Sequence, residues 1–195
     1  MADDIESVAL DLQFRPFRPA DALITIAWRY PVPYSAYNLD PQDPAILAAV
    51  LRPEYNYHAI IQNDEVVGFF LLGTDAQVDG GTYDESALDI GFGLRPDLTG
   101  RGQGSSYFDV VLRYIEAQMP GRSLRAAVAA WNQRAIRLCQ RAGFRVLGHF
   151  ISRREGKEEE YVTLLKAAEF RSSNPRPFAS DEPGSKFPRL RKTQE

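Results

Sequence analysis

The sequence predicts an α/β fold in which a mixed, mostly antiparallel sheet of about six to seven strands carries helices on both faces. Three observations support this prediction. Segments with strand periodicity alternate with segments of helical periodicity. Two pairs of neighbouring strands are joined by connections short enough for β-hairpins. One further strand, residues 124–130, is apolar apart from Arg125, which is typical of a buried parallel strand.

The first half of the chain supplies a strand, two helices and a hairpin. Alternating apolar residues predict the first strand, which Pro16 and Pro19 end, and proline opens the second helix, where its missing N–H does no harm. The aromatic and proline-rich segment 30–37 cannot be a regular helix or a central strand. The expected elements are strand 8–14, helix 20–28 (with Leu23, Ile24, Ala27 and Trp28 on one face), helix 44–51, and paired strands 55–61 and 66–72.

The second half alternates strands and helices. Gly91 and Gly93 lie inside a strand, where glycine indicates a bulge or a close approach of the backbone. Asn132 is suited to cap the last helix and Gly143 to end it, with Ala135, Leu138, Cys139 and Ala142 facing inward. The expected elements are strand 88–94, helix 107–119, strand 124–130, helix 132–142, and strands 144–152 and 159–165.

Length and composition favour a single ordinary domain. The chain has 195 residues, 44% of them hydrophobic, and a formal net charge of −3, which disfavours a general binder of nucleic acid or of anionic membranes. One cysteine, no basic leader and no apolar run of membrane-spanning length favour a soluble protein in the cytoplasm. We expect a domain over residues 1–168, a flexible, proline-rich and basic tail over 169–195, and no metal site.

The stretch from Asp89 to Ser106 has the features of a phosphate-binding loop. A strand is followed by glycines at positions 100, 102 and 104, and then by a segment of helical periodicity. Converging backbone N–H groups and the positive end of a helix dipole hold phosphate groups in this arrangement. Three alternating glycines exceed what a simple turn requires, so we expect a phosphate-bearing ligand.

Two common phosphate motifs do not fit this loop. A dinucleotide fingerprint needs a third glycine at a spacing that falls here on Tyr107 or Ser105, and the next strand ends without the acidic residue that would bind a ribose. A nucleoside triphosphate loop needs a lysine after its last glycine, and Gly104 is followed by Ser105.

Two separate segments match a third pattern. Leu94-Arg-Pro-x-x-Thr-Gly-Arg-Gly-Gln-Gly104 resembles the acetyl-coenzyme A loop of the GNAT N-acetyltransferase superfamily, with Thr99 standing where that family usually has glutamine or arginine. Residues Asn132 to Phe144 resemble its Asn-x-x-Ala-x-x-Leu-Tyr-x-x-x-Gly-Phe segment. The order of elements from about Val8 to Leu165 also follows the GNAT fold, whose sheet splays at the coenzyme site.

The resemblance implies a set of coenzyme contacts. The pantetheine arm would slip between strand 88–94 and strand 124–130, and the Leu94 N–H would face the thioester carbonyl. Asn132 would bond to the pantetheine amide, and Arg134 to the 3′-phosphate. The residues expected to bind acetyl-CoA are Leu94, Arg95, Thr99, Gly100, Arg101, Gly102, Gln103, Gly104, Ser105, Asn132 and Arg134.

The resemblance also suggests two catalytic side chains, each with a structural alternative. Asp89 aligns with a carboxylate that takes the proton of the acceptor amine, although a strand-end aspartate can equally sit in an ion pair. Cys139 replaces the tyrosine that protonates the departing coenzyme thiolate, although it can equally be a small apolar residue of the core.

The sequence therefore predicts an enzyme that transfers the acetyl group of acetyl-CoA directly to a primary amine. The acceptor would be a small molecule, a peptide or a protein, and the oligomeric state, including a homodimer, stays open. Aromatic residues at positions 28, 30, 34 and 37 belong to the segment that would roof the acceptor site. The alternative is a non-catalytic acyl-CoA-binding module, which the replacements at Thr99 and Cys139 would suit.

Overall fold

The computed structural model describes residues 10–154 and 156–168. The elements are β1 (Gln13–Pro16), α1 (Pro19–Ile26), η1 (Tyr34–Tyr37), α2 (Pro44–Val50), η2 (Pro53–Tyr55), β2 (His58–Gln62), β3 (Glu65–Leu72), η3 (Thr74–Ala76), β4 (Ala87–Leu94), η4 (Pro96–Leu98), α3 (Gly104–Gln118), β5 (Ser123–Ala129), α4 (Gln133–Arg141), β6 (Arg145–Arg154) and β7 (Lys157–Lys166). The tail expected at 169–195 lies outside the described residues.

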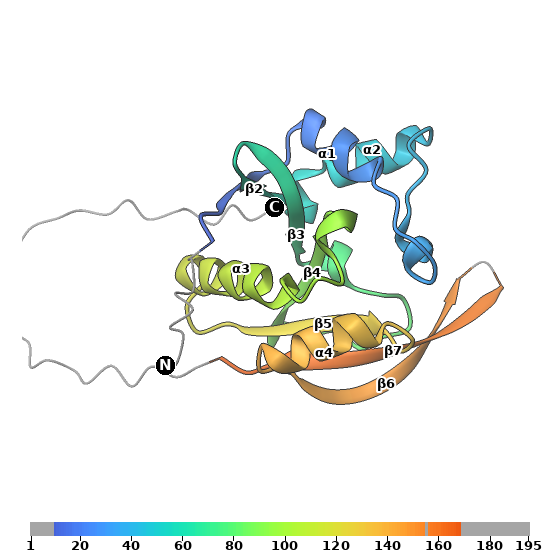
Figure 1. Cartoon of the computed structure of the whole chain (residues 1–195). Helices are drawn as coiled ribbons and strands as arrows, with labels where there is room; N and C mark the ends of the chain where they lie inside the picture. The colour runs from blue at the N-terminus through green and yellow to red at the C-terminus, as the bar shows by residue number, and fades with distance from the viewer. Residues whose placement is uncertain (1–9, 155, 169–195) are drawn as a thin grey trace, which may run out of the picture.

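The seven strands form one sheet in the order β1-β2-β3-β4-β5-β7-β6. Every neighbouring pair is antiparallel except β4 and β5, which run parallel. The mixed, mostly antiparallel sheet predicted from the sequence is thereby confirmed, and both expected hairpins, β2–β3 and β6–β7, are present (Figure 1).

Helices cover the two faces of the sheet at different places. α3 and α4 lie side by side on one face and bury Phe108, Val111, Ile115 and Ile136 against strand residues such as Phe70 and Leu164. α1 and α2 cover the opposite face over β2 and β3, through Ala22 and Ile26 (Figure 1). The same opposite face of β5, β6 and β7 carries no helix among the described residues, which leaves it open for other contacts.

The first two elements differ from the prediction. The strand spans Gln13–Pro16 rather than 8–14, and residues 8–9 lie outside the described part of the chain. Pro16 is accommodated because β1 is an edge strand, where a missing N–H breaks no ladder bond. In α1 the buried apolar residues are Ala22 and Ile26, whereas Leu23 and Ile24 are exposed.

A buried ion pair explains why α1 buries a different face from the predicted one. The Asp21 carboxylate is buried and accepts hydrogen bonds from the Arg15 guanidinium and from the Arg18 N–H. This turns the face of Ala22 toward α2 and leaves Leu23 outside. A periodicity argument that counts only apolar residues misses such a buried ion pair.

Three further elements bear on the site. The helix expected at 107–119 already begins at Gly104, directly after the glycine loop. Gly91 and Gly93 sit in regular register with β3, and no bulge occurs there. The side chains of Leu71 and Phe69 lie across these glycines, 2.4 Å from where each Cβ would stand, so close approach is the reason for both glycines.

Candidate active site

The two parallel strands separate after a short contact. β4 and β5 pair only from Ala87↔Ser123 to Asp89↔Arg125, although both strands continue for several residues (Figure 1). Backbone bonds join Gly73 to Asp89 and Arg95 to Val67, so the odd-numbered residues of β4 face β3. Because the direction alternates along a strand, the N–H and C=O groups of Phe92 and Leu94 point to the β5 side, into the gap.

The glycine loop follows the open end of β4. Gly100 and Gly102 have φ angles of +75° and +79°, a region that side chains other than glycine rarely adopt. A Cβ at Gly102 would have nothing within 4 Å, so the loop stands open, and α3 begins two residues later with no acidic residue in its first turn. Exposed backbone N–H groups at a helix N-terminus form a cradle for phosphate.

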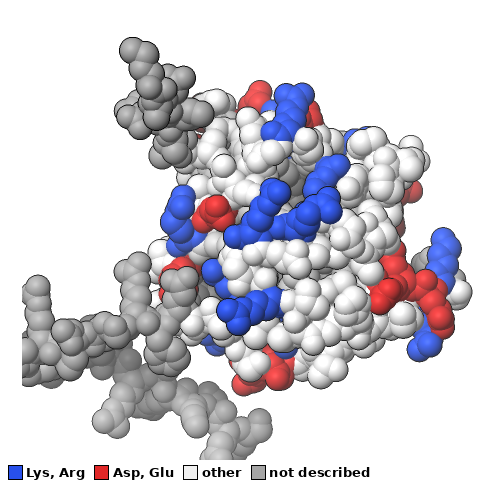
Figure 2. Space-filling view, turned by 60° about the horizontal axis from the view of Figure 1, so that its bottom comes forward, with Lys and Arg blue, Asp and Glu red and all other residues white. Residues whose placement is uncertain are grey.

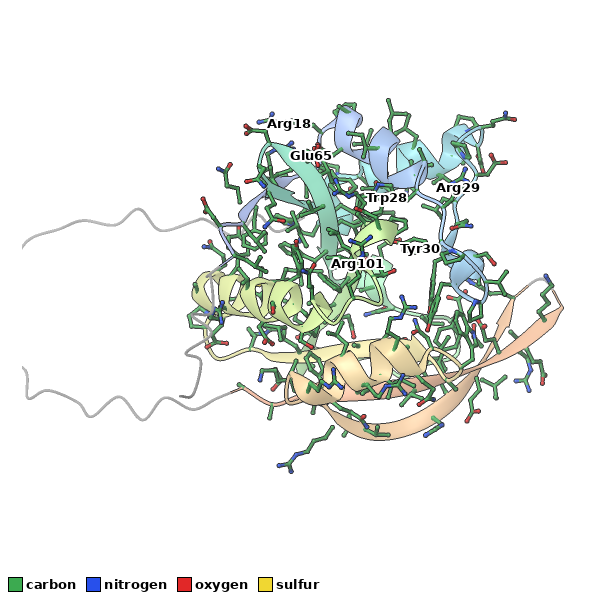
Figure 3. The ribbon with its side chains drawn as sticks, viewed as in Figure 1. Arg18, Trp28, Arg29, Tyr30, Glu65 and Arg101 are labelled. Atoms are coloured by element: carbon green, nitrogen blue, oxygen red, sulfur yellow. The ribbon has the colours of Figure 1, made fainter. Side chains whose placement is uncertain are left out.

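Several side chains of this loop have local partners. Thr99 Oγ1 donates to the Pro96 carbonyl at 2.8 Å, so the hydroxyl serves the turn. The Arg95 guanidinium bonds to Glu65 and to Asp97, each at 2.8 Å, so its charge is already paired. Arg101 and Gln103 are exposed and Ser105 is half-buried. Figure 3 shows Arg101 near the end of β4.

The start of α4 forms the other side of the gap. Asn132 is buried and caps the helix through Oδ1, which accepts from the Ala135 N–H at 3.0 Å, as predicted. The Arg134 guanidinium lies over the Tyr34 ring at 3.9 Å and beside Gly100, 3.8 Å from where a Cβ would stand. Arg134 therefore lies next to the glycine loop, where a cation can contact a bound phosphate. Figure 2 shows further basic side chains across the middle of one face.

Two tyrosine hydroxyls of the α1–α2 connection reach the two sides of the gap. Tyr30 Oη donates to the Leu94 carbonyl at 2.7 Å (Figure 3), and Tyr37 Oη accepts from Asn132 Nδ2 at 2.9 Å. Burial raises the pKa of Tyr30 to about 12 and also raises that of Tyr37, so both hydroxyls stay protonated at neutral pH. The sequence indicated an aromatic roof but gave neither tyrosine a partner.

Asp89 lies in a buried ion pair. Arg125 donates to its carboxylate from Nε at 2.6 Å and from Nη2 at 3.1 Å, and Gln77 Nε2 donates at 2.8 Å. Both partners of the pair are about 5% exposed. Arg125 also bonds to Asp84 and stacks over the Tyr83 ring. The structure thus places Asp89 in the ion pair that was the structural alternative to a catalytic base.

Cys139 lies in the apolar core. Its thiol is buried among the residues that α3 and α4 pack against the sheet, including Phe144 and Ile136. Burial raises the pKa of Cys139 to about 12. This environment matches the alternative of a small apolar residue better than that of a proton donor, because Cys139 is buried in an apolar cluster of the described residues.

Two features near the site were not predicted. The β3–β4 loop crosses the face of the sheet opposite α3 and α4 and borders a polar cavity of about 560 Å³, lined by residues between Thr74 and Tyr83 and by Arg154. Gln77, a lining residue, links this cavity to Asp89. A cluster of aromatic residues around Glu159 lies where β5 ends. Loop residues distant in sequence carry no periodicity that could have revealed either feature.

The gap and the loop suit acetyl-coenzyme A in chemical type. The gap-side backbone groups of β4, apart from the Leu94 carbonyl that accepts from Tyr30, can pair with the amides of a pantetheine arm, and the loop with its neighbouring arginine can hold a pyrophosphate. Both left-handed positions, Gly100 and Gly102, are glycine, so neither places a side chain in this cradle. The residues present therefore fit the coenzyme that the two sequence motifs implied.

Comparison with known proteins gives the same fold. The chain aligns with solved structures of a GNAT-family acetyltransferase from Bacillus anthracis (16% identity, 80% of this chain and 94% of that chain, TM-score 0.64) and of a phosphinothricin acetyltransferase from Sinorhizobium meliloti in complex with AcCoA (15%, 80% and 88%, 0.57). A spermidine N-acetyltransferase chimera from Vibrio cholerae and a human enzyme aligns at 14% identity over 80% and 95%, with a TM-score of 0.62. No curated protein matches the sequence.

The family assignment rests on a sequence model. The model of the acetyltransferase (GNAT) domain matches residues 11–145, which is more than half of the chain. The co-substrate of this family is acetyl-CoA, and a solved neighbour holds it. No helix in the described residues is both long and apolar enough to cross a membrane. The chain belongs to the GNAT family of acetyltransferases.

Proposed function

We propose that this protein transfers the acetyl group of acetyl-CoA directly to a primary amine, within a ternary complex and without a covalent enzyme intermediate. The observation that carries the proposal is the separation of β4 from β5 after Asp89. It leaves the backbone groups of Phe92 and Leu94 facing a gap that ends at the glycine loop. Acetyl-CoA supplies an activated thioester there, and the chain's residues bind and orient it.

The proposed roles follow from these contacts. Backbone N–H groups of residues 100–105 bind the pyrophosphate, with Arg134 beside them. The Leu94 N–H lies on the gap side and can donate to the thioester carbonyl oxygen. The amine binds on the face of the sheet opposite α3 and α4, which is bordered by the aromatic α1–α2 connection and by the β3–β4 loop.

We assign the proton donor to Tyr37 rather than to Cys139. Tyr37 Oη accepts a hydrogen bond from Asn132, and among the described residues its own O–H donates to no side chain or carbonyl. The hydroxyl of Tyr30, by contrast, is committed to the Leu94 carbonyl. Asp89 is a positioning residue in this proposal: its carboxylate holds Arg125, and the amine loses its proton to solvent before it attacks.

The proposed domain spans residues 1–168, with residues 169–195 as an appendage. Deleting 169–195 is expected to leave acetylation of small amines unchanged. A non-catalytic acyl-CoA-binding module is the rival function, and the locked Asp89 and buried Cys139 favour it. The two functions differ in turnover rather than in coenzyme affinity.

One experiment separates the two functions. Binding of acetyl-CoA is measured by calorimetry, and free thiol release is followed over a panel of primary amines, amino acids and peptides. We expect binding together with amine-dependent thiol release and recovery of the N-acetylated amine. Tight binding with no product from any amine would support the rival, and absence of coenzyme binding would contradict both functions.

A further inference from the structure

We propose that Glu159 is the anchor for a second, positively charged group of the acceptor, so that the preferred substrates carry two basic groups. This proposal rests on the proposed function, because it specifies the amine that is acetylated. Glu159 lies on β7, on the face of the sheet opposite α3 and α4, which is the face proposed above to receive the amine.

Within residues 10–154 and 156–168, the hydrogen-bond donors to Glu159 are neutral groups rather than cations. Trp131 Nε1 donates to its Oε1 at 2.7 Å, and Tyr161 Oη donates to its Oε2 at 2.8 Å. The two neighbouring glutamates differ: Glu158 bonds to Arg153 and Glu160 to the ring of His149. The bonds from Trp131 and Tyr161 orient the carboxylate of Glu159 and leave its negative charge to attract a ligand.

Aromatic rings form the walls around this carboxylate. Tyr34 and Tyr37 pack against Trp131, with ring centroids 5.8 Å and 5.5 Å apart. Faces of tyrosine and tryptophan attract ammonium groups, and a carboxylate among them strengthens the attraction. The wall already binds one cation, because the Arg134 guanidinium lies 3.9 Å from the centre of the Tyr34 ring.

The cluster is continuous with the reacting end of the gap. Tyr37 contacts Trp131 through its ring and Asn132 through its hydroxyl, so one residue joins the Glu159 cluster to the start of α4. Burial first, and the charge of Glu159 in addition, raise the pKa of Tyr37. A ligand held at Glu159 therefore lies next to the hydroxyl that we assign as proton donor.

Chemistry excludes Glu159 as the holder of the reacting nitrogen. That amine must be uncharged to attack a thioester, whereas a carboxylate beside an ammonium stabilises the protonated form. The group that pairs with Glu159 must then be a different one, which stays charged throughout the reaction. A diamine, or an amine that carries a quaternary ammonium, has the two groups that this arrangement requires.

The test compares two amines that differ only in the second charge, 1,4-diaminobutane and n-butylamine. In the wild-type enzyme we expect a lower KM for the diamine. Glu159→Gln keeps the shape and an acceptor oxygen, and it should raise the KM for the diamine about tenfold, leaving kcat and the KM for n-butylamine nearly unchanged. Glu160→Gln, which removes the same charge on the other face of β7, is the matched control and should change neither value.

The outcomes distinguish this proposal from the proposed function. Binding of 1,4-diaminobutane is also measured by calorimetry with acetyl-CoA absent, so that turnover is not required. Diamine binding that Glu159→Gln weakens, without acetylation of any amine, would support the anchor and contradict the acetyltransferase activity on amines. Acetylation with unchanged diamine affinity in Glu159→Gln, a loss confined to kcat, or equal effects on both amines would each overturn the anchor.

Discussion

The two ends of β4 are built in opposite ways. At its start, Leu88 and Asp89 pair with β5, and the Asp89 carboxylate accepts from Arg125 and Gln77. At its end, Leu94 pairs only with β3, and its gap-side carbonyl accepts from the hydroxyl of Tyr30 in the α1–α2 connection. The first end is closed by interactions within the sheet, and the second is open to a ligand.

This contrast shows where catalytic groups are available on the strand. A carboxylate whose lone pairs are occupied by a guanidinium and an amide holds the fold together and has little capacity to take a proton. A backbone that lacks a neighbouring strand has unpaired N–H and C=O groups, which a ligand can satisfy. On β4, the backbone groups at the open end are therefore better candidates for ligand binding than the Asp89 carboxylate at the closed end is for catalysis.

The largest expected effect is at the closed end. Arg125→Met leaves the buried Asp89 carboxylate without its ion-pair partner and should lower the free energy of unfolding by about 3–5 kcal/mol. Denaturant unfolding measures this loss. The exposed pair partner Arg153 is the control, since Arg153→Met should cost less than about 1 kcal/mol.

Asp89→Asn in the Arg125→Met background removes the stranded charge and should restore part of the lost stability. If Asp89→Asn alone instead keeps the protein stable while kcat falls by orders of magnitude, Asp89 is the base after all, and the closed end takes part in the chemistry.

The second effect concerns the open end. Tyr37→Phe removes the hydroxyl that we assign as proton donor and should lower kcat about 10²- to 10⁴-fold, with little change in the affinity for acetyl-CoA. Tyr30→Phe is the matched variant: it removes a hydroxyl that bonds to the strand, so its main effect should be on coenzyme affinity. Steady-state kinetics with a saturating amine separates the two. Equal effects of both variants on kcat would contradict the assignment of Tyr37 as the proton donor.

More of the fold than of the candidate site could be predicted from the sequence. Periodicity located β4, β5 and both hairpins, because local patterns determine which residues of a strand are buried. The glycine spacing and the Asn132 cap were also local, and the left-handed φ of Gly102 and the cap of α4 agree with them. The Asp89–Arg125 pair joins residues 36 positions apart, and nothing in the sequence shows which register brings them together.

The same limit applies to the acceptor side. Tyr37, Asn132 and Glu159 come from three distant segments, and only the folded chain places their side chains in contact or in one cluster. Cys139 had two possible roles in the sequence, because a helix position that faces inward can point to a core or to a ligand. The packing of α3 against α4 favours the core.

A smaller effect is expected on acetyl-CoA affinity at Gly102, and Gly156, a glycine with a similar left-handed conformation, serves as its control. Gly102→Ala and Gly156→Ala each force alanine into a left-handed conformation, with φ of +79° and +76°, and neither added Cβ meets an atom within 4 Å. Both should lose about 1 kcal/mol of stability. Only Gly102→Ala should weaken acetyl-CoA binding, by about tenfold, because only that loop follows the open end. Calorimetry checks both variants, and equal affinities would place the phosphates elsewhere.

The smallest expected effect is on turnover at Cys139, which we group with the closed end. Cys139→Ala should leave kcat within about threefold of wild type, whereas removal of a general acid costs about 10²–10⁴. The native thiol should also resist a thiol reagent near neutral pH, because burial raises its pKa to about 12. A loss of activity of the larger size would move Cys139 into the chemistry.

The pH dependence of stability gives an independent check on the same thiol. The pKa of Cys139 is higher in the folded protein than in the unfolded chain, where it is about 8.5. The stability that the neutral thiol contributes is therefore fully present below about pH 8.5 and is lost as the pH rises toward about 12. Unfolding at pH 7 and pH 9.5 should show a larger decline for the wild type than for Cys139→Ala. Equal declines would mean that the thiol ionises as easily in the fold as in water, and that the core around it is open.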